Sequence, residues 1–574
     1  MFSKFRLIPA LVAMAFLISS CGSNAPKEAR FIPKDASAVL IVDPKNMEDK
    51  LEKSGISMDT LINHLFKRNA MDTTERSMFQ SIKDSAGMDW SNKVFLFALQ
   101  NGNANTGKST AVNLIMGLKS GSEFEAFLKR QPSLGTKKIQ KEKDYTYLVT
   151  SPESMIAWDD KNVIGTFYQN EVKPYYDTVA MKFVVPEKGN SDSAMRAEVN
   201  KYFTQKKDAS LASVDAFSKM FKTNADGYAF ASTNSYLNVL SAMPLQLPKL
   251  EELVKDNYMA ATLSFEEGKI VATTTTFTNP FVSNLLKKYA GPTVNLSLLE
   301  HYPSENINMI MMASFNPAIF GGILKELEVE GLVNSFMDKT GFSAQDLYKT
   351  LKGDIAVVVS DLGMPGKEIG VKNDSTISVS RKPIGKMIFT APVGDTASFA
   401  KIMNKAVELG YFSKQGNTYK ISSKIPSLGL YMQADDKNLI MASDSLTYAQ
   451  YVSNKSKAVV GNDALNLFKG KSTVAYFDIT NTIKGFMNST GSNYQNSMSS
   501  AKNILKDVIA TTDNFEDGAV KGKMEIRLNN EKQNSLATLT GLFTDIAVDM
   551  RMAAKKESEQ SMFPSGVPAI IRTN

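Results

Sequence analysis

The sequence predicts an α+β protein made of two tandem, internally duplicated domains of mainly antiparallel sheet with flanking helices. Three features of the chain lead to this class. Short apolar segments, bounded by turn residues and joined by brief loops, favour antiparallel strand pairing. Apolar stripes with helical spacing lie among these segments without alternating strictly with them, which argues against a doubly wound parallel sheet. Similar segments also recur in both halves of the chain in the same order.

The N-terminus has the pattern of a secretory signal. Two basic residues precede an apolar run, Leu7–Ile18, that contains a single proline. At a rise of ~1.5 Å per residue this run spans about 18 Å, too short to cross roughly 30 Å of hydrocarbon as a transmembrane helix. The segment Leu17–Cys21 then resembles the lipobox of bacterial lipoprotein signal peptides. We therefore expect residues 1–20 to be a lipoprotein signal peptide and Cys21 to carry the lipid, palmitate included, that anchors the chain to a membrane.

Cysteine usage agrees with this interpretation. Cys21 is the only cysteine, so the mature chain has no disulfide although its expected compartment is oxidising. A thioether to lipid would remove the one free thiol. Ordinary signal cleavage is the alternative, but Ile18–Ser20 fits the small-residue pattern of such sites poorly.

Composition excludes several classes of function. The apolar content of 43% and charged content of 22% are those of a well-packed soluble protein. The formal charge of +7 is spread thinly, without a basic cluster interleaved with aromatics, so nucleic-acid binding has no electrostatic basis. Two histidines and one cysteine exclude the usual His/Cys zinc site. No cofactor is expected.

The repeat begins with two matching segments, Ile32–Asn46 and Tyr302–Pro317. Each has a Pro-containing polar lead-in, an apolar strand, and then Asp-Pro or Asn-Pro. An Asp or Asn followed by proline is a good helix start, because the side chain caps the helix and proline needs no N–H partner there. The two helices are expected to end near Gly55 and Gly331.

The strongest anchor of the repeat is the sequence DDKN, found at Asp159–Asn162 and Asp435–Asn438. The offset between the two copies equals the offset between the two glycines. Each copy lies between two apolar runs, which predicts a hairpin turn rather than an acid/base pair. A hairpin at 258–277 is expected to match one at 522–541. Apolar residues at helical spacing over Leu539–Met550 predict a closing helix.

The repeat sets the expected domain boundaries. A polar tether occupies 21–30, the first α+β repeat domain 31–290 and the second 300–556, followed by a C-terminal tail at 557–574. The first domain holds extra residues between about 168 and 215.

One segment matches the phosphate-binding P-loop pattern through Gly102, Gly107, Lys108 and Ser109. That motif works because a helix N-terminus follows it and points at the phosphates. Here the following segment, Ala111–Leu118, favours a strand, and the matching loop of the second copy lacks the hydroxyl residue. We interpret the match as chance, in a polar hairpin loop, and expect no nucleotide binding.

A tyrosine cluster lies in the stretch that is unique to the first copy. Tyr168, Tyr175 and Tyr176 are candidate contacts to a partner, because exposed tyrosines stack on sugars and anchor interfaces. Partly buried loop aromatics are the more common alternative.

Nucleophilic catalysis of the Ser–His–acid kind would need His64 or His301. Neither lies near a G-x-S-x-G element. A Ser/Lys pair assembled in space stays open as a possibility, because both residue types are abundant.

The whole mature chain resembles an uncharacterised family of large lipoproteins of Gram-negative bacteria, classed as a domain of unknown function. The resemblance rests on the lipobox, the opening Ile32–Ala36 with the strand and Asp43–Pro44 that follow, and the duplicated layout. It implies an outer-membrane location in the cell envelope and brings no catalytic residues.

These features lead us to expect a lipid-anchored envelope protein that acts as a non-enzymatic binding or scaffold module. Its partners would be the membrane, through the lipid, and another envelope protein or a glycan. A periplasmic or surface hydrolase acting on peptide or glycan is the alternative.

Overall fold

The computed structural model describes residues 25–57, 59–60, 73–103, 107–132, 134–177, 180–185, 191–240, 249–300, 302–363, 384–422, 430–453, 462–487 and 495–562. These residues form two compact units. The first unit contains the described residues of Met1–Asn46, Gln80–Pro244 and Val254–Thr262, and the second contains those of Met47–Phe79, Leu245–Leu253 and Leu263–Asn574. The predicted boundary between residues 290 and 300 stays a prediction.

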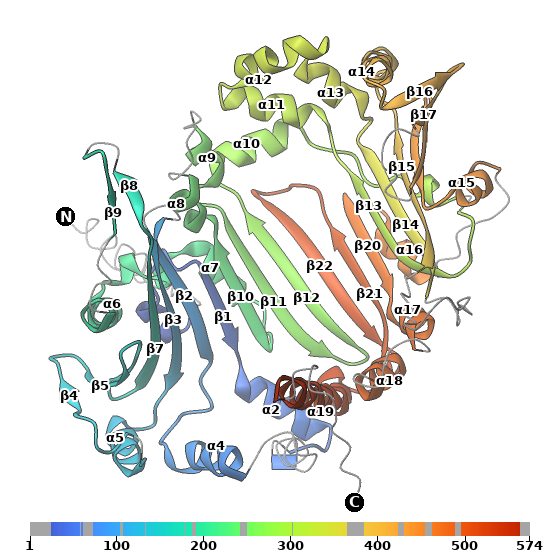
Figure 1. Ribbon diagram of the computed structural model, residues 1–574. Coiled ribbons are helices and arrows are strands. Elements are labelled where there is room, and N and C mark those ends of the chain that lie inside the picture. Colours follow the sequence, from blue (N-terminus) through green and yellow to red (C-terminus); the bar gives the residue numbers. More distant parts are fainter. Residues whose placement is uncertain are drawn as a thin grey trace, which may run out of the picture. The chain divides into compact units, whose positions relative to one another are not determined.

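The first unit is built on an antiparallel sheet whose long strands lie side by side in Figure 1. In order of pairing, the strands are β10 (Gly227–Ser232), β1 (Ala38–Val42), β2 (Val94–Asn103), β3 (Gly107–Gly117), β7 (Asn162–Val172), β6 (Ser154–Trp158), β5 (Thr146–Ser151) and β4 (Gln140–Lys141). A separate hairpin pairs β8 (Tyr175–Asp177) with β9 (Lys182–Val184).

Helical segments pack on both faces of this sheet, since Phe124 of the helix Gly121–Arg130 joins Val163 on one face and Tyr202 of the helix Ser191–Thr204 meets Phe97 on the other. They include η1 (Lys27–Phe31), α5 (Gly121–Arg130), α6 (Ser191–Thr204), η2 (Lys207–Ala209), η3 (Leu211–Ser213), α7 (Asp215–Met220), η4 (Thr233–Tyr236) and α8 (Leu237–Leu240). Two aromatic contacts seal the main layer: Tyr202 of α6 meets Phe97 of β2 with ring centroids 5.4 Å apart, and Phe217 of α7 meets Phe230 of β10 at 5.2 Å. The sheet side chains that face Tyr202 and Phe217 form the covered face, and they are buried. They alternate along each strand with side chains of the opposite face, because successive strand residues point to opposite sides.

The second unit is built on a longer antiparallel series. Its paired strands are β12 (Lys269–Phe277), β22 (Ala519–Leu528), β21 (Leu505–Thr512), β20 (Thr473–Asp478), β13 (Ile307–Ser314), β14 (Asp354–Gly363), β15 (Ile384–Pro392), β19 (Asn438–Ala442), β18 (Tyr431–Ala434), β17 (Thr418–Ile421) and β16 (Phe412–Gln415). Strand β11 (Tyr258–Glu266) divides between the two units.

Helices of the second unit pack on both faces of its sheet, since the core cluster that holds Ile388 and Phe468 and the cluster that holds Leu439 and Phe399 lie on opposite faces. They are α10 (Pro280–Lys288), η5 (Leu296–Leu299), α11 (Ala318–Glu326), α12 (Glu330–Met337), η6 (Asp338–Thr340), α13 (Ala344–Thr350), α14 (Thr396–Glu408), α15 (Ser445–Val452), α16 (Asn462–Phe468), α17 (Ile479–Phe486), α18 (Gln495–Ile504) and α19 (Ser535–Met562). The main core joins Ile310, Val358 and Ile388 of three adjacent strands to Tyr302 before β13 and Phe468 of α16. The predicted α+β class with mainly antiparallel sheet is confirmed.

Three helices have residues in both units: α2 (Pro44–Lys53), α4 (Thr73–Ser85) and α9 (Leu250–Val254). Asp43 caps α2 as predicted, since its carboxylate accepts the N–H of Asn46 at 3.1 Å. Within the second unit, Leu51 of α2 packs against Leu536 and Ala537 at the start of α19.

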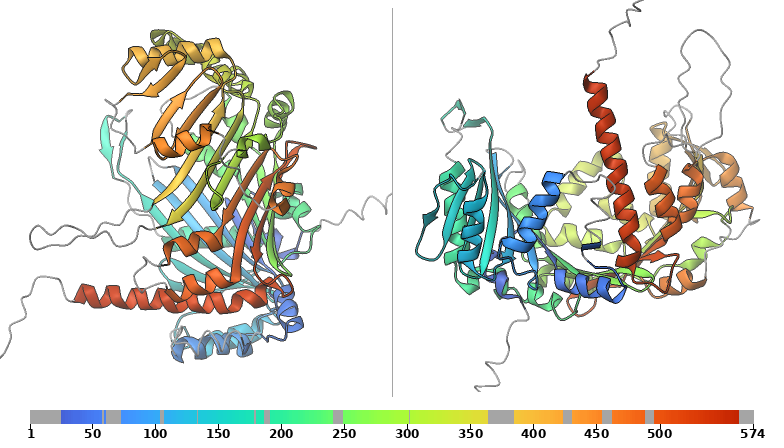
Figure 2. Two further views of the ribbon diagram at one scale, coloured as in Figure 1. Left: turned by 90° about the vertical axis from the view of Figure 1, so that its right-hand side faces the viewer. Right: turned by 90° about the horizontal axis from the view of Figure 1, so that it is seen from below.

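The closing helix is longer than expected. α19 continues to Met562, past the expected start of the tail at 557, because Ala, Lys, Glu and Gln in its last turns are good helix formers. Its far end projects from the rest of the second unit in both views of Figure 2. Of its predicted apolar stripe, Leu539 and Leu542 are buried, whereas Phe543 and Met550 are exposed.

Three local expectations were wrong. The tether ends before residue 30, because η1 begins at Lys27 and Ala29 is buried. The helix after Pro317 does not end at Gly331, which lies inside α12; Glu328, with a φ of 59°, makes the left-handed turn between α11 and α12. The second-half hairpin is β21–β22 (505–528) rather than 522–541, since residues from Ser535 onward are helical.

Arg527 holds a buried ion pair across β21 and β22. Its Nε and Nη2 donate to the two carboxylate oxygens of Asp507, both at 2.6 Å, and Nη1 contacts Asp463 of α16. The hydrogen bonds to Asp507 raise the pKa of Arg527, so the guanidinium stays charged. Asp507 is almost fully buried and directly opposite Arg527 in the strand register.

We expect Arg527→Met to lower the free energy of unfolding of the second unit by about 3–5 kcal/mol, because Asp507 is left buried without its partner. Thermal unfolding followed by circular dichroism measures the change. Lys129→Met is the matched control, since it breaks an exposed pair with Glu125 whose loss costs about 0.5 kcal/mol or less. An equal effect of the two substitutions would contradict the assignment.

Candidate functional site

The first unit exposes apolar side chains on the sheet face opposite to α6 and α7, beyond the part of that face on which α5 packs. On β1, Val39 and Ile41 are buried, but Leu40, between them, is 53% exposed. The same alternation leaves Leu96 of β2 at 40% and Phe167 of β7 at 48%. We call the exposed set the apolar sheet face; its members are Leu40, Val42, Leu96, Val112, Leu114 and Phe167.

Strand register makes this face contiguous. Leu40 lies opposite Leu96, Leu96 opposite Leu114, and Val112 opposite Phe167, so the side chains form rows across four strands. Directly opposed side chains have Cβ atoms about 4.5–5.5 Å apart. Gly165 lies opposite Leu114, and a Cβ added there would meet nothing within 4 Å. The row therefore ends beside open space.

Polar residues border the apolar sheet face at the far ends of the same strands. Thr110 lies opposite Gln169, and Lys108 lies opposite Glu171. A contiguous apolar patch with a polar rim is typical of a surface that binds another molecule.

The covered face of the same sheet contains a buried polar chain instead of a reactive site. The hydroxyl of Thr166 donates to the amide oxygen of Asn113 at 2.8 Å, and the amide nitrogen of Asn113 donates to the Tyr202 hydroxyl at 3.2 Å. Burial raises the pKa of Tyr202, so its hydroxyl stays protonated. These bonds fix α6 on the sheet.

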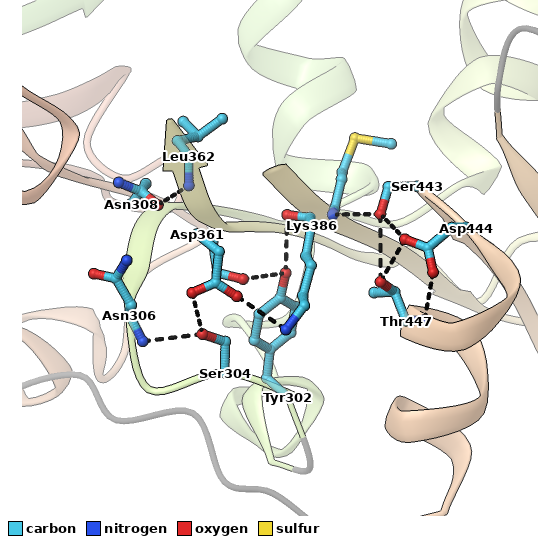
Figure 3. A network of polar contacts seen from close by, with 12 residues as sticks. Tyr302, Ser304, Asn306, Asn308, Asp361, Leu362, Lys386, Ser443, Asp444 and Thr447 are labelled. Carbon is cyan, nitrogen blue, oxygen red and sulfur yellow. Dashed lines mark hydrogen bonds and ion pairs between the residues drawn. The ribbon is translucent and has the colours of Figure 1, made fainter. Parts of the chain in front are cut away.

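The second unit holds the polar network shown in Figure 3. Its centre is Asp361, which has a φ of 52° where the register of β14 shifts. Ser304 donates to one carboxylate oxygen of Asp361 at 2.9 Å, and Lys386 pairs with the other at 3.0 Å. A bulge commonly redirects a side chain in this way.

Further bonds tie the network to the backbone. Tyr302, fully buried, donates from its hydroxyl to the carbonyl of Val358 at 3.0 Å. Asn308 accepts the N–H of Leu362 at 3.0 Å and donates to Thr482 at 3.1 Å. These contacts hold the start of β13 against the end of β14.

A second part of the network caps α15. Asp444 accepts the N–H of Thr447 at 2.8 Å, and Ser443 donates to the other oxygen of Asp444 at 2.9 Å. The N–H of Met387 also donates to Ser443, at 3.3 Å. Local capping therefore joins α15 to β15.

The arrangement bears on the Ser/Lys possibility. Ser304 and Lys386 come within reach of one carboxylate, but each is engaged with Asp361, which bridges them. A general base must lie within hydrogen-bond reach of the group that it deprotonates, whereas here the carboxylate of Asp361 lies between Ser304 and Lys386. The network is suited to holding strands together.

The predicted P-loop residues lie in the β2–β3 hairpin. Gly102 is opposite Lys108, and β3 begins at Gly107, so Lys108 and Ser109 are strand residues and no helix N-terminus follows them. A Cβ on Gly102 would lie 2.5 Å from the carbonyl oxygen of Gly107. Gly102 is therefore explained by the close approach of the two strands, and Gly107 by its φ of 116°.

The three tyrosines are separated by the structure. Tyr168 lies on β7 with its side chain 7% exposed, on the covered face, and so presents no surface for a partner. Tyr175 and Tyr176 lie on β8; Tyr176 is exposed and meets Phe183 of β9 with ring centroids 5.2 Å apart. The apolar sheet face was not predicted from the sequence. Its signal in the sequence is that apolar residues continue without polar alternation along β1, β2 and β3.

Other candidate residues lie outside the described part of the chain, namely Cys21, His64 and His301. Among the residues that the structure describes, no group of three or more His, Cys, Asp or Glu side chains is placed to hold a metal ion. In that same part of the chain, no helix combines the length and apolar character needed to cross a membrane. The DDKN turns are confirmed: Asp159 accepts the N–H of Asn162 at 2.7 Å, and Asp435 that of Asn438 at 2.8 Å.

Tyr302 gives the network of the second unit a testable pH dependence. Burial raises the pKa of Tyr302, so this residue stabilises the fold fully below the ordinary tyrosine pKa, about 10, and less as pH rises above it. We expect Tyr302→Phe to cost about 1 kcal/mol near neutral pH, through the lost hydrogen bond to Val358. The difference from the wild type should narrow above about pH 10. Urea unfolding at neutral and at alkaline pH measures both values, and a difference that widens with pH would contradict this role.

Comparisons with known proteins bear on the family. No curated protein matches the chain. A solved structure, "Structure of crystal form I of TP0453", shares 11% identity, covers 47% of this chain and 88% of its own, and has a TM-score of 0.22, too low to support an argument. The family described as "Domain of unknown function (DUF4836)" matches residues 29–536, most of the sequence. The chain therefore belongs to this family.

Proposed function

We propose that this protein is a lipid-anchored cell-envelope module that binds another envelope protein, without catalysis, through the apolar sheet face of its first unit. The observation that carries the proposal is the set of rows from Leu40 to Phe167, exposed across four adjacent strands. Apolar surface that is buried in an interface contributes a binding free energy of roughly 25 cal/mol per Å², before the costs of association are subtracted. A protein segment with an apolar surface of its own buries more of this area than a glycan does, so a protein is the expected partner.

A repeated order of paired strands supports this kind of module. The order of paired strands from β4 through β7, β3, β2 and β1 to β10 in the first unit is repeated from β16 through β19, β15, β14 and β13 to β20 in the second. The DDKN turn occupies the same place in both series, before β7 and before β19. We infer two tandem copies of one α+β unit.

The lipid anchor is proposed from sequence. The lipobox ends at Cys21, and the first described residue, Ala25, follows closely. Multiple acyl chains hold a protein stably, whereas one chain gives only marginal binding. We place the anchored protein at the outer membrane.

Charge on the apolar sheet face should prevent partner binding without unfolding the protein. We expect Leu96→Asp with Leu114→Lys to lower the yield of a cross-linked partner from intact cells by about tenfold or more, because two charges enter a dry interface. The two residues lie opposite each other, so the introduced charges can pair and the sheet is preserved. Affinity purification from the membrane fraction, followed by mass spectrometry, measures the yield.

The matched control for that experiment is Leu409→Asp with Leu446→Lys, which changes two exposed leucines elsewhere. It should leave the partner's yield unchanged. Equal recovery of a partner with both double variants, or recovery of none by the wild type, would contradict the proposed function.

The anchor has a separate test. Cells fed an alkyne-tagged palmitate should label the wild type, whereas Cys21→Ala should abolish labelling because no thiol remains to accept lipid. Ser23→Ala, just beyond the site, should be labelled as the wild type is. Label on the Cys21→Ala protein would show that the lipid is attached elsewhere.

A further inference from the structure

A cavity in the first unit lies at the point where the described chain begins. Its volume is about 660 Å³, within the usual range of ligand pockets, and its wall includes Ala25 and Pro26, the first described residues. Other parts of the wall come from η1, from the segment after β3, and from the DDKN turn before β7. One ligand could therefore contact elements that are far apart in sequence.

The cavity wall is strongly basic. It carries Lys27, Arg30, Lys119, Lys161 and Lys207, against two acids, Glu28 and Asp89. The carboxylate of Asp89 is already engaged, because it accepts bonds from the Ser91 hydroxyl at 2.6 Å and the Asn92 amide at 3.0 Å.

The four lysines are unpaired in the part of the chain that the structure describes, where no ion-pair partner faces Lys27, Lys119, Lys161 or Lys207. Arg30 is the exception, since it contacts Asp159 at 3.6 Å and lies over the ring of Phe31, 4.5 Å from its centroid. A group of unpaired ammonium groups around one cavity repels itself, and an anion would relieve that repulsion.

Apolar residues form the inner part of the cavity. Phe31 and Leu118 are each 2% exposed, and both belong to the lining together with Pro26 and Ala212. An inorganic anion would use only the basic rim. A ligand with a phosphate and an adjoining apolar portion would use both parts.

Chain length places this cavity near the proposed anchor. Three residues lie between Cys21 and Ala25, so four residue steps of at most ~3.6 Å each span no more than about 14 Å. If Cys21 is held in a membrane, the cavity thus lies within about two Debye lengths of the headgroups, since one is ~8 Å at physiological ionic strength.

We propose that this cavity binds the phosphate group of an anionic phospholipid headgroup, and so holds the first unit against the membrane that carries the anchor. The inference rests on the proposed lipid anchor for the source of its ligand. The lysines act as point charges toward the phosphate, and the apolar inner part receives the carbon atoms next to it.

The test uses the full mature chain with Cys21→Ser, so that no attached lipid contributes to binding. The probes are vesicles of phosphatidylcholine alone, vesicles of phosphatidylcholine and phosphatidylglycerol in equal amounts, and inorganic phosphate. Co-sedimentation should show a preference of about tenfold for the mixed vesicles. Lys119→Glu with Lys161→Glu should remove that preference, because each basic residue near a charged surface contributes about a factor of five or more to binding.

The control is Lys138→Glu with Lys222→Glu, two exposed lysines of the same unit outside the cavity. It makes the same change in net charge, and should alter vesicle binding by no more than about twofold. Unchanged thermal unfolding of both variants confirms that they are folded.

The outcomes separate the sources of phosphate. Vesicle binding that depends on the cavity lysines supports the headgroup. Calorimetry could instead show that inorganic phosphate binds the wild type and not the cavity variant, while neither kind of vesicle is preferred. That result would overturn the headgroup as the ligand and favour a soluble phosphate compound. Equal loss in cavity and control variants, or no binding of either probe, would overturn the site itself. None of these readouts depends on lipidation, so failure here is distinct from failure of palmitate labelling at Cys21.

Discussion

Apolar side chains on both faces of the central strands are the constraint on which the rest of the first unit depends. Val39 and Leu40 alternate along β1, yet only the face of Val39 is sealed by α6 and α7. Burying a side chain of this size contributes about 1.5–3 kcal/mol relative to exposure, so an open row of leucines forgoes a sizeable part of the sheet's possible stability. A continuous apolar run is the pattern of strands that are covered on both faces. These exposed rows are the surface on which the proposed protein partner would lie.

Polar groups inside the two units serve a different purpose from those at the surface. Asn113, Thr166 and Tyr202 satisfy one another, and Arg527 satisfies Asp507. A buried polar group without a partner costs about 1–3 kcal/mol, so complete bonding favours one strand register over its neighbours. Asn113, Thr166, Tyr202 and Asp507 are buried, so these groups do not face the solvent. Capacity for a ligand is found instead at the open apolar face and among the unpaired lysines of the cavity.

Much of the architecture could be predicted because its signals are local. The DDKN turns depend on one Asp side chain bonding to N–H groups two and three residues ahead, which any hairpin can provide. The strand character of Ala111–Leu118 likewise excluded a helix after Lys108, as β3 shows. Tyr168 was misjudged because β7 continues to Val172, and the period of two then turns residue 168 inward with Ile164 and Thr166. Glu328 takes a left-handed position of the kind that glycine usually occupies, so no local sequence pattern reveals this turn.

The candidate sites could not be predicted, because each depends on residues brought together by pairing across the sheet or by chain reversal. Leu40 and Phe167 share a face only through the register of β1, β2, β3 and β7. Lys27 and Lys207 share a cavity only because η1 and η2 lie on the same side of the unit. This arrangement also explains how weak contacts can matter. A tethered module meets its membrane at an effective concentration of about millimolar, so a headgroup site with a Kd near 1 mM would be substantially occupied. If Cys21 carries a lipid, the anchor provides the attachment, and the headgroup site only has to set the orientation of the first unit on the membrane. The apolar sheet face would then be left free for a protein partner.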